Sequence, residues 1–174
     1  MTSQTIMQLV AVVVGGLIAI TGGFLSTTVL ERRRLRQESR NLAFAFRGEI
    51  TAILELIRER NYLERFQQVI EQIEQSGESF YMPFHIRFKY DLVYSSNVSK
   101  IGLLKEPLHE QIPLFYTRLT SILEEMVNLG EGVYSQLEQE ILLRIYRDTR
   151  RAIQLTVTQG EEILASITDL YSDS

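Results

Sequence analysis

The sequence predicts an all-α protein in which an N-terminal transmembrane helix continues into an antiparallel helical bundle, with one extended, aromatic-rich segment crossing the helices. Three observations predict this fold class: an uncharged apolar stretch near the N-terminus, apolar residues at helical spacing through most of the remaining chain, and only 3 Pro and 10 Gly among 174 residues. Beyond a membrane helix, a chain of this length has room for about one ordinary domain. We therefore expect a short tail at 1–5, a transmembrane helix at 6–30, an Arg-rich juxtamembrane helix at 31–40 and a bundle domain at 41–174.

The stretch 6–30 contains 25 residues without a charged side chain, and about 20 suffice to cross a hydrocarbon core of roughly 30 Å. The alternative is a cleaved signal peptide, which would have basic residues before an apolar stretch of about 7 to 15 residues. Here no basic residue precedes the stretch, whereas five arginines follow it between residues 31 and 40. Because Lys and Arg are retained on the cytoplasmic side, we expect a single-pass protein of the cell inner membrane with its N-terminus outside and its C-terminal domain in the cytoplasm.

Two sets of residues in and beside this stretch are candidates for contacts in the membrane. Small side chains recur at every fourth position, on one helix face where another backbone can approach closely: Ala11, Gly15, Ala19, Gly23 and Thr27. The alternative explanation is that Gly and Ala are common in membrane helices. The juxtamembrane arginines are expected to contact lipid headgroups and to set the topology: Arg32, Arg33, Arg34, Arg36 and Arg40. The expected partners are therefore the lipid membrane and another transmembrane helix, either from a second copy or from a different subunit.

The first helix is expected to continue into the bundle domain, because no Gly or Pro interrupts residues 31–47. Its apolar residues recur at helical spacing: Ala43, Phe46, Ile50, Ile53 and Ile57, with Phe44 and Leu54 widening the stripe. The register shifts around residues 60–62, which predicts a kink or short turn. A second stripe then runs to Ser76 and Gly77, a typical helix C-terminus.

Residues 78–90 alternate apolar and polar side chains, which is the period of a strand. Pro83 and the lack of a second strand argue against a sheet, so we expect an extended segment laid over the helices. A short helix at about 91–100 should follow and end at Gly102.

The third long helix is predicted by a seam of apolar residues with steps of four and three: Leu108, Ile112, Phe115, Leu119, Ile122 and Met126. Pro107 fits its first turn, whereas Pro113 should kink the first turns or delay the regular start. The last helix is expected from Val133 to Tyr171, with Gly160 as a tolerated weak point or a bend. Its predicted apolar face consists of Leu137, Ile141, Ile145, Ala152, Ile153, Ile163, Ile167 and Leu170.

Composition and motifs argue against nucleic-acid binding, metal binding and catalysis. Residues 41–174 contain 13 basic and 20 acidic side chains, so a nucleic-acid partner is not expected. The chain has no cysteine, which excludes thiolate metal sites and cysteine nucleophiles. A single Glu106-x-x-His109 motif falls short of the two that a di-iron bundle uses. We find no nucleophile motif or phosphate loop, and therefore expect no catalytic residue, metal or cofactor.

Four arginines in the last helix, Arg144, Arg147, Arg150 and Arg151, raise the possibility of a patch for anionic lipids or acidic partners. The simpler interpretation is a solvated face with pairs between Glu140 and Arg144 and between Arg144 and Asp148.

One segment supports a resemblance. The run from Tyr94 through Asn97 and Lys100 to Gly102-Leu103-Leu104, followed by Leu114-Phe115-Tyr116, resembles a pattern of small bacterial single-pass, membrane-anchored helical proteins of unassigned function, over residues 84–120. The resemblance implies a helical fold and a membrane anchor and implies no reaction. From the residues themselves, Gly102 suits a helix end that needs positive φ, and Asn97 or Lys100 is expected to hold the turn or to face a partner.

Together these features predict a non-enzymatic, membrane-anchored accessory or scaffold protein that binds a partner membrane protein or self-associates. The alternative is a membrane-linked signalling or sensor module that transmits a change through the long helix to a separate output protein.

Overall fold

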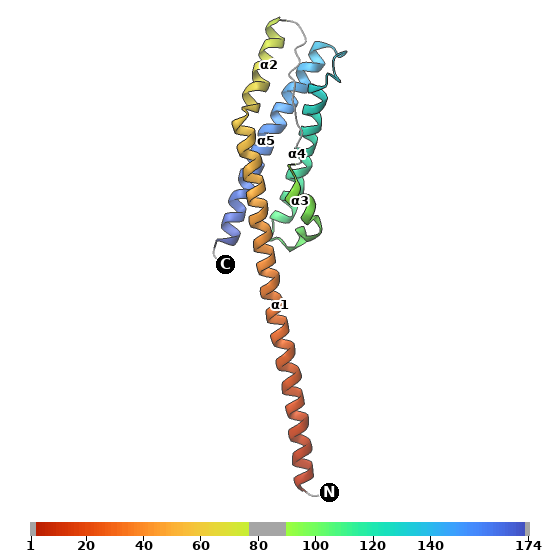
Figure 1. The fold of residues 1–174 in the computed structure, drawn as a ribbon, viewed down its shortest axis with the longest axis vertical. Coiled ribbons are helices and arrows are strands. Elements are labelled where there is room, and N and C mark those ends of the chain that lie inside the picture. The colour runs from red at the N-terminus through yellow and green to blue at the C-terminus, as the bar shows by residue number, and fades with distance from the viewer. Residues whose placement is uncertain (1–2, 77–89, 173–174) are drawn as a thin grey trace. The chain divides into compact units, whose positions relative to one another are not determined.

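The computed structural model describes the backbone of residues 3–76 and 90–172, with side chains from residue 28 onward in these ranges. In chain order the elements are α1 (Ser3–Glu59), α2 (Tyr62–Ser76), α3 (Leu92–Asn97), the 3-10 helix η1 (Val98–Leu103), α4 (Leu108–Gly130) and α5 (Gln139–Tyr171). No strand occurs within these described ranges. The predicted all-α bundle is confirmed (Figure 1).

The chain divides into two compact units, Met1–Arg40 and Asn41–Ser174. The second unit begins at the residue where the bundle domain is predicted to begin. In the described part of the chain, no helix carries an apolar stretch long enough to cross a bilayer. The predicted span 6–30 lies outside the described side chains up to Thr27, and so do all five small residues of its proposed packing face. The extended segment predicted at 78–90 also lies outside the described residues, except for Tyr90.

Within the second unit, α5 lies between α2 and α4 (Figure 1). The direction of the α2–α5 pair follows from two hydrogen bonds to backbone carbonyls. Gln139 Nε2 at the start of α5 donates to Ile73 O near the end of α2 at 2.9 Å, and Arg150 Nε donates to Leu63 O at 3.2 Å. Residues later in α5 therefore lie beside residues earlier in α2, so the two helices are antiparallel.

The break between α1 and α2 occurs where the apolar register shifts. Asn61 has a φ of +49°, and its backbone N–H donates to Arg58 O at 2.9 Å. Asn tolerates this left-handed conformation better than most residues. The predicted short turn around residues 60–62 is confirmed.

The predicted seam of α4 is confirmed, because all six of its residues are buried. The predicted delay of the helix start is wrong: α4 begins at Leu108, directly after Pro107, and contains Pro113. A proline at the sixth helical residue removes one backbone bond to the carbonyl of residue 109. The buried residues on either side, Ile112 and Phe115, hold this turn against the core, so the loss is tolerated.

The predicted start of the last helix is wrong, and so are the first two residues of its predicted apolar face, whereas Ile153 is buried and Ile145 and Ala152 pack partly buried against the core. Residues 131–137 form turns, with Gly132 at a φ of +71°, and α5 begins only at Gln139. Leu137 and Ile141 are 36% and 41% exposed. The residues that face the core in this half of α5 are Leu142, Tyr146, Thr149 and Ile153. The physical reason is that α5 packs against α2 here, and contact with the buried residues of α2 sets its register.

α5 continues as one helix through Gly160. A Cβ atom at Gly160 would lie 3.0 Å from Leu54 Cδ2 and 3.1 Å from Phe115 Cε2. At Gly160, α5 therefore lies close to side chains of α1 and α4, and the missing side chain makes this approach possible.

The core consists of two groups of buried residues. The α1 cluster joins the bundle part of α1, η1, the start of α4 and the end of α5, and consists of Leu42, Ala43, Phe46, Ile50, Ile53, Leu54, Ile101, Leu104, Leu108, Ile112, Phe115, Tyr116, Leu119, Val157, Ile163, Ile167 and Tyr171. The α2 cluster joins α2, the end of α4 and the start of α5, and consists of Tyr62, Phe66, Val69, Ile70, Ile73, Ile122, Met126, Leu129, Leu142, Tyr146 and Ile153.

Candidate functional site

One acidic residue lies on the apolar face of α1. Glu49 follows Phe46 by three residues and precedes Ile53 by four, a spacing that places all three on one side of a helix. Phe46 and Ile53 are buried in the α1 cluster, and Glu49 is half-buried beside them. A carboxylate in such a place needs hydrogen-bond donors, because burying an unsatisfied charge is costly.

Three donors from two other helices meet the Glu49 carboxylate. The backbone N–H of Val93 donates to Glu49 Oε1 at 2.7 Å, and the backbone N–H of Tyr94 donates to Oε2 at 3.2 Å. The Tyr116 hydroxyl on α4 also donates to Oε2. We call Glu49, Val93, Tyr94 and Tyr116 the Glu49 junction, since it joins α1, α3 and α4 through one side chain.

The junction provides hydrogen-bond acceptors for the first backbone N–H groups of α3. The first N–H groups of a helix have no partner inside the helix and are usually capped by a side chain just before it. In the described chain, Asp91 occupies that position and makes no side-chain cap; its carboxylate instead accepts a hydrogen bond from the Ser95 hydroxyl at 3.1 Å. Glu49 supplies the missing cap from a different helix, 44 residues earlier in the chain.

Tyr116 anchors the aromatic side of the junction. Its ring stacks on Tyr94 with centroids 4.3 Å apart and an interplanar angle of 13°, and the Phe46 ring lies 6.2 Å away in a tilted arrangement. Burial, the hydrogen bond to Glu49 and the negative charges of Glu49 and Asp91 raise the pKa of Tyr116 above its usual value. Tyr116 therefore stays protonated and remains a hydrogen-bond donor throughout the physiological pH range.

The Glu49 oxygens accept three hydrogen bonds from the protein itself, out of about four that a carboxylate can accept. This arrangement fixes the carboxylate between α1, α3 and α4. A groove of about 270 Å³ beside Glu49 is lined otherwise by Ala52, Ile53, Leu56 and Tyr90. Among the residues that the structure describes, its lining is mainly apolar and includes no second carboxylate or histidine.

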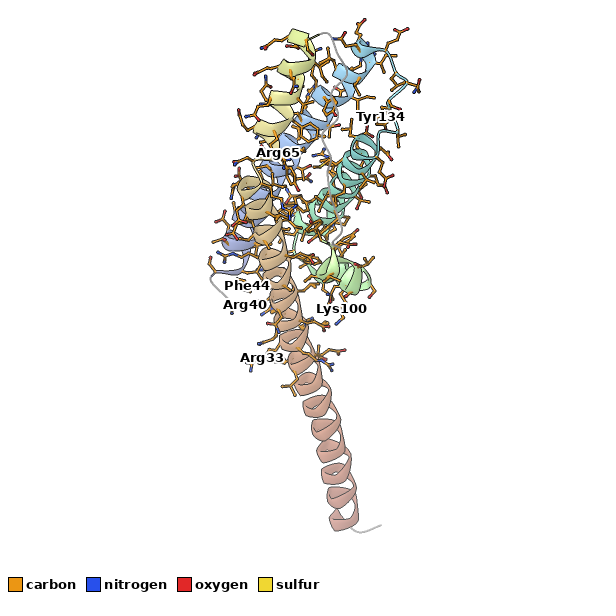
Figure 2. All side chains as sticks on the ribbon, turned by 45° about the horizontal axis from the view of Figure 1, so that its top comes forward. Arg33, Arg40, Phe44, Arg65, Lys100 and Tyr134 are labelled. Atoms are coloured by element: carbon orange, nitrogen blue, oxygen red, sulfur yellow. The ribbon has the colours of Figure 1, made fainter. Side chains whose placement is uncertain are left out.

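The residues expected to hold the turn or to face a partner lie in the segment that the junction holds. Asn97, the last residue of α3, donates from Nδ2 to Val93 O at 2.8 Å. Lys100 lies on η1, at the opposite end of the bundle from Tyr134 (Figure 2). Gly102 lies inside η1 and has no positive φ, so the expectation that it ends a helix in that conformation is wrong. Continuing the 3-10 turn through residue 103 leaves Gly102 in an ordinary conformation.

The other predicted polar groups lie apart from the junction. Arg32, Arg33, Arg34 and Arg36 are exposed and Arg40 is half-buried. On α5, Arg147 pairs with Glu74 of α2 and Arg150 donates to Leu63 O of α2, so two of the four arginines join helices of the bundle. His109 Nε2 lies 3.9 Å from Glu110 Oε1, and His85 lies outside the described residues. Among the residues that the structure describes, no group of three or more His, Asp or Glu side chains is placed to hold a metal ion.

The junction was not identified from the sequence, although the unusual place of Glu49 is visible in the sequence. An acidic residue at the apolar spacing of α1 marks Glu49 as unusual. The donors that explain it are 44, 45 and 67 residues away, and no local pattern connects them. The tertiary structure alone brings them together.

No protein-family model, curated protein or solved structure matches this chain. Its function is therefore inferred from its own residues.

Proposed function

We propose that the chain is a non-enzymatic accessory or scaffold protein, anchored in the cell inner membrane by residues 6–30, whose cytoplasmic bundle domain accompanies a partner membrane protein or a second copy of itself. The observation that carries this proposal is the uncharged stretch of 25 residues followed by five arginines within the next ten. The resemblance of residues 84–120 to membrane-anchored helical proteins supports the same anchor.

The membrane helix is the first place to look for the partner contact. On the bundle, large apolar side chains more than 45% exposed are spread over α3, η1, α4, the α4–α5 turn and α5, and include Leu92, Val98, Leu114, Val133 and Leu155. Scattered exposed apolar residues are normal on protein surfaces and mark no single docking face. The repeated small residues at 11, 15, 19, 23 and 27 form the one periodic pattern that favours a close helix–helix contact.

The anchor is tested by extracting membranes with alkaline carbonate. The full chain should stay in the membrane pellet, and a variant lacking residues 1–30 should be released. Release of the full chain by carbonate would contradict the anchor.

The partner is tested by purifying the tagged full chain in a mild detergent and identifying what accompanies it in stoichiometric amount. Gly15→Leu with Gly23→Leu should release the partner, because both substitutions fill the small-residue face. The matched control is Gly16→Leu with Gly22→Leu, which makes the same change on other faces of the helix. Equal recovery of the partner with both variants would show that the small-residue face is not the contact, and a monomer without companions would contradict the accessory role.

A second candidate is the signalling module, in which α1 transmits movement to a separate output protein. The Glu49 junction favours it, because a single side chain of α1 holds both α3 and α4. Such a role requires that the junction open and close.

A further inference from the structure

The segment held by the junction has little buried surface of its own. The structure describes all six residues of α3, and none of them is buried. In η1, Ile101 is the buried residue. Val93 and Tyr94 are half-buried and pack against the α1 cluster. The stability of a local element against opening rises with the apolar surface it buries, so residues 92–103 depend on a few contacts.

Apart from Ile101, which is buried in the α1 cluster, these contacts lie at the two ends of the segment. At the N-terminal end, Glu49 binds the N–H groups of Val93 and Tyr94, and the Tyr94 ring stacks on Tyr116. At the C-terminal end, Lys105 is fixed to α5: its backbone N–H donates to the Tyr171 hydroxyl at 3.1 Å, and its ammonium group donates to Leu170 O at 2.5 Å. Leu104, next to it, is 5% exposed. Lys105 and Leu104 are therefore the point at which the chain is firmly attached, and residues 92–103 precede it.

The main helix pairs of the bundle do not depend on this segment. α5 packs against both α4 and α2. Arg118 Nη1 of α4 donates to Gln159 Oε1 of α5 at 2.9 Å, and Gln139 Nε2 of α5 donates to Ile73 O of α2 at 2.9 Å. Removing α3 and η1 from the surface would leave these pairs in contact.

We propose that residues 92–103 form a latch that opens as a unit while α1, α2, α4 and α5 stay folded, and that Glu49 makes this latch sensitive to the position of α1 relative to α4. When it opens, the Val93 and Tyr94 N–H groups exchange Glu49 for water, and the Tyr94 ring leaves Tyr116.

The geometry explains the sensitivity. A helix rises 1.5 Å per residue, and N–H···O hydrogen bonds span only about 2.7–3.2 Å between the donor nitrogen and the acceptor oxygen. The bonds from Val93 N and Tyr94 N to Glu49 are 2.7 and 3.2 Å long. A movement of α1 along its axis by one residue's rise would break at least one of them, whereas apolar contacts between helices adapt to such a shift more gradually. The inference goes beyond the proposed accessory role and does not rest on the membrane anchor.

The test is hydrogen–deuterium exchange of the full chain in a mild detergent, followed by mass spectrometry of peptides. In the wild-type protein, the amides of residues 92–103 should exchange at least about tenfold faster than those in the middle of α4 and α5. Glu49→Gln, which removes the charge and one acceptor, should accelerate exchange in residues 92–103 by a further factor of about ten and change α4 and α5 less than twofold.

The matched control is Glu55→Gln, the same change at an exposed position of the same helix, and it should leave residues 92–103 at the wild-type rate. Tyr116→Phe, which keeps the ring and removes the hydroxyl donor, should accelerate the same residues less than Glu49→Gln does. Wild-type residues 92–103 that exchange as slowly as α4 and α5 would overturn the proposal. So would a Glu49→Gln variant in which every helix is accelerated equally, since that pattern means global unfolding.

Discussion

The two halves of the bundle are stabilised differently. The α2 cluster consists of apolar side chains packed around the Phe66–Tyr146 ring pair, whose centroids lie 5.8 Å apart. Its hydrogen bonds and ion pair lie at its edges. The α1 cluster is packed around Gly160 and contains a carboxylate, Glu49, at the border of its core. α5 runs through both halves.

The α2 cluster is stabilised by apolar packing, whereas the Glu49 junction fixes the relative positions of helices. Apolar contacts are non-directional and approximately proportional to buried area, so the α2 cluster resists opening without fixing one relative position of its helices sharply. The Glu49 junction buries little surface but demands specific distances between α1, α3 and α4. We infer that apolar packing carries the stability of the α2 cluster, and that the α1 cluster, where the Glu49 junction sets specific distances, holds the part of the bundle able to rearrange.

The largest effect is expected from Phe66→Ala in the α2 cluster. Phe66 is fully buried, and removing such a ring leaves a cavity that lowers the free energy of unfolding by about 3–5 kcal/mol. Chemical denaturation followed by circular dichroism measures the loss. Phe44→Ala is the control, because Phe44 is 37% exposed and should cost clearly less. Equal losses would mean that burial of the Phe66 ring does not stabilise the α2 cluster.

A smaller loss is expected from Gly160→Leu in the α1 cluster. The new side chain would overlap with Leu54 and Phe115, and overpacking of this kind lowers the free energy of unfolding by about 1–3 kcal/mol. Gly48→Leu is the matched control: Gly48 is on an exposed helical position with no neighbouring atom within 4 Å of an added Cβ. Because Leu favours helices more than Gly, Gly48→Leu should raise the melting temperature. A neutral Gly160→Leu would show that the close approach of α5 is not needed.

Alkaline pH should weaken the α1 cluster through Tyr116. The pKa of Tyr116 is raised in the folded protein, so its full contribution to the free energy of unfolding is present below the usual tyrosine pKa near 10. Above that pH, the unfolded chain loses the phenolic proton that the folded chain keeps, and the free energy of unfolding falls by about 1 kcal/mol by pH 11. Unfolding measured between pH 8 and 11 should show this loss in the wild type and less of it in Tyr116→Phe. Parallel curves for the two proteins would contradict the buried, bonded state of Tyr116.

The smallest effect is expected at the edge of the α2 cluster. Arg147 and Glu74 form an ion pair whose side chains are about half exposed, and such pairs contribute about 0.5 kcal/mol or less in salt. Arg147→Ala should lower the free energy of unfolding slightly at low salt, with the difference shrinking in 1 M NaCl. Arg144→Ala, one turn earlier on α5, is the comparison variant. A salt-independent loss above about 2 kcal/mol would place this ion pair among the interactions that close the α2 cluster.

Much of the fold follows from local patterns, and the exceptions have physical causes. The register shift before Tyr62 and the apolar seam of α4 are visible because helical spacing repeats over several turns. The start of α5 is not visible in the sequence, because residues 131–137 also contain apolar side chains. Contact with α2 then decides which residues of α5 face the core. Gly160 looks like a weakness by helix propensity, and only the neighbouring helices explain why a side chain is excluded there.

The candidate site is harder still to predict. The segment from Asn97 to Gly102 stands out in the sequence, and the structure places it in the proposed latch. Glu49, which holds that segment, differs from any solvated glutamate only by its place on the apolar stripe, since its donors come from residues far along the chain.

The central claim is that Glu49 and Tyr116 act together in holding α1 to α4, and a double-mutant cycle tests it most directly. The free energy of unfolding is measured for the full-length wild type, Glu49→Gln, Tyr116→Phe and the double variant. If the two side chains are bonded as described, the double variant should cost less than the sum of the single losses, with a coupling energy of about 1 kcal/mol. Losses that add within about 0.3 kcal/mol would show that the two residues act independently and would contradict the account.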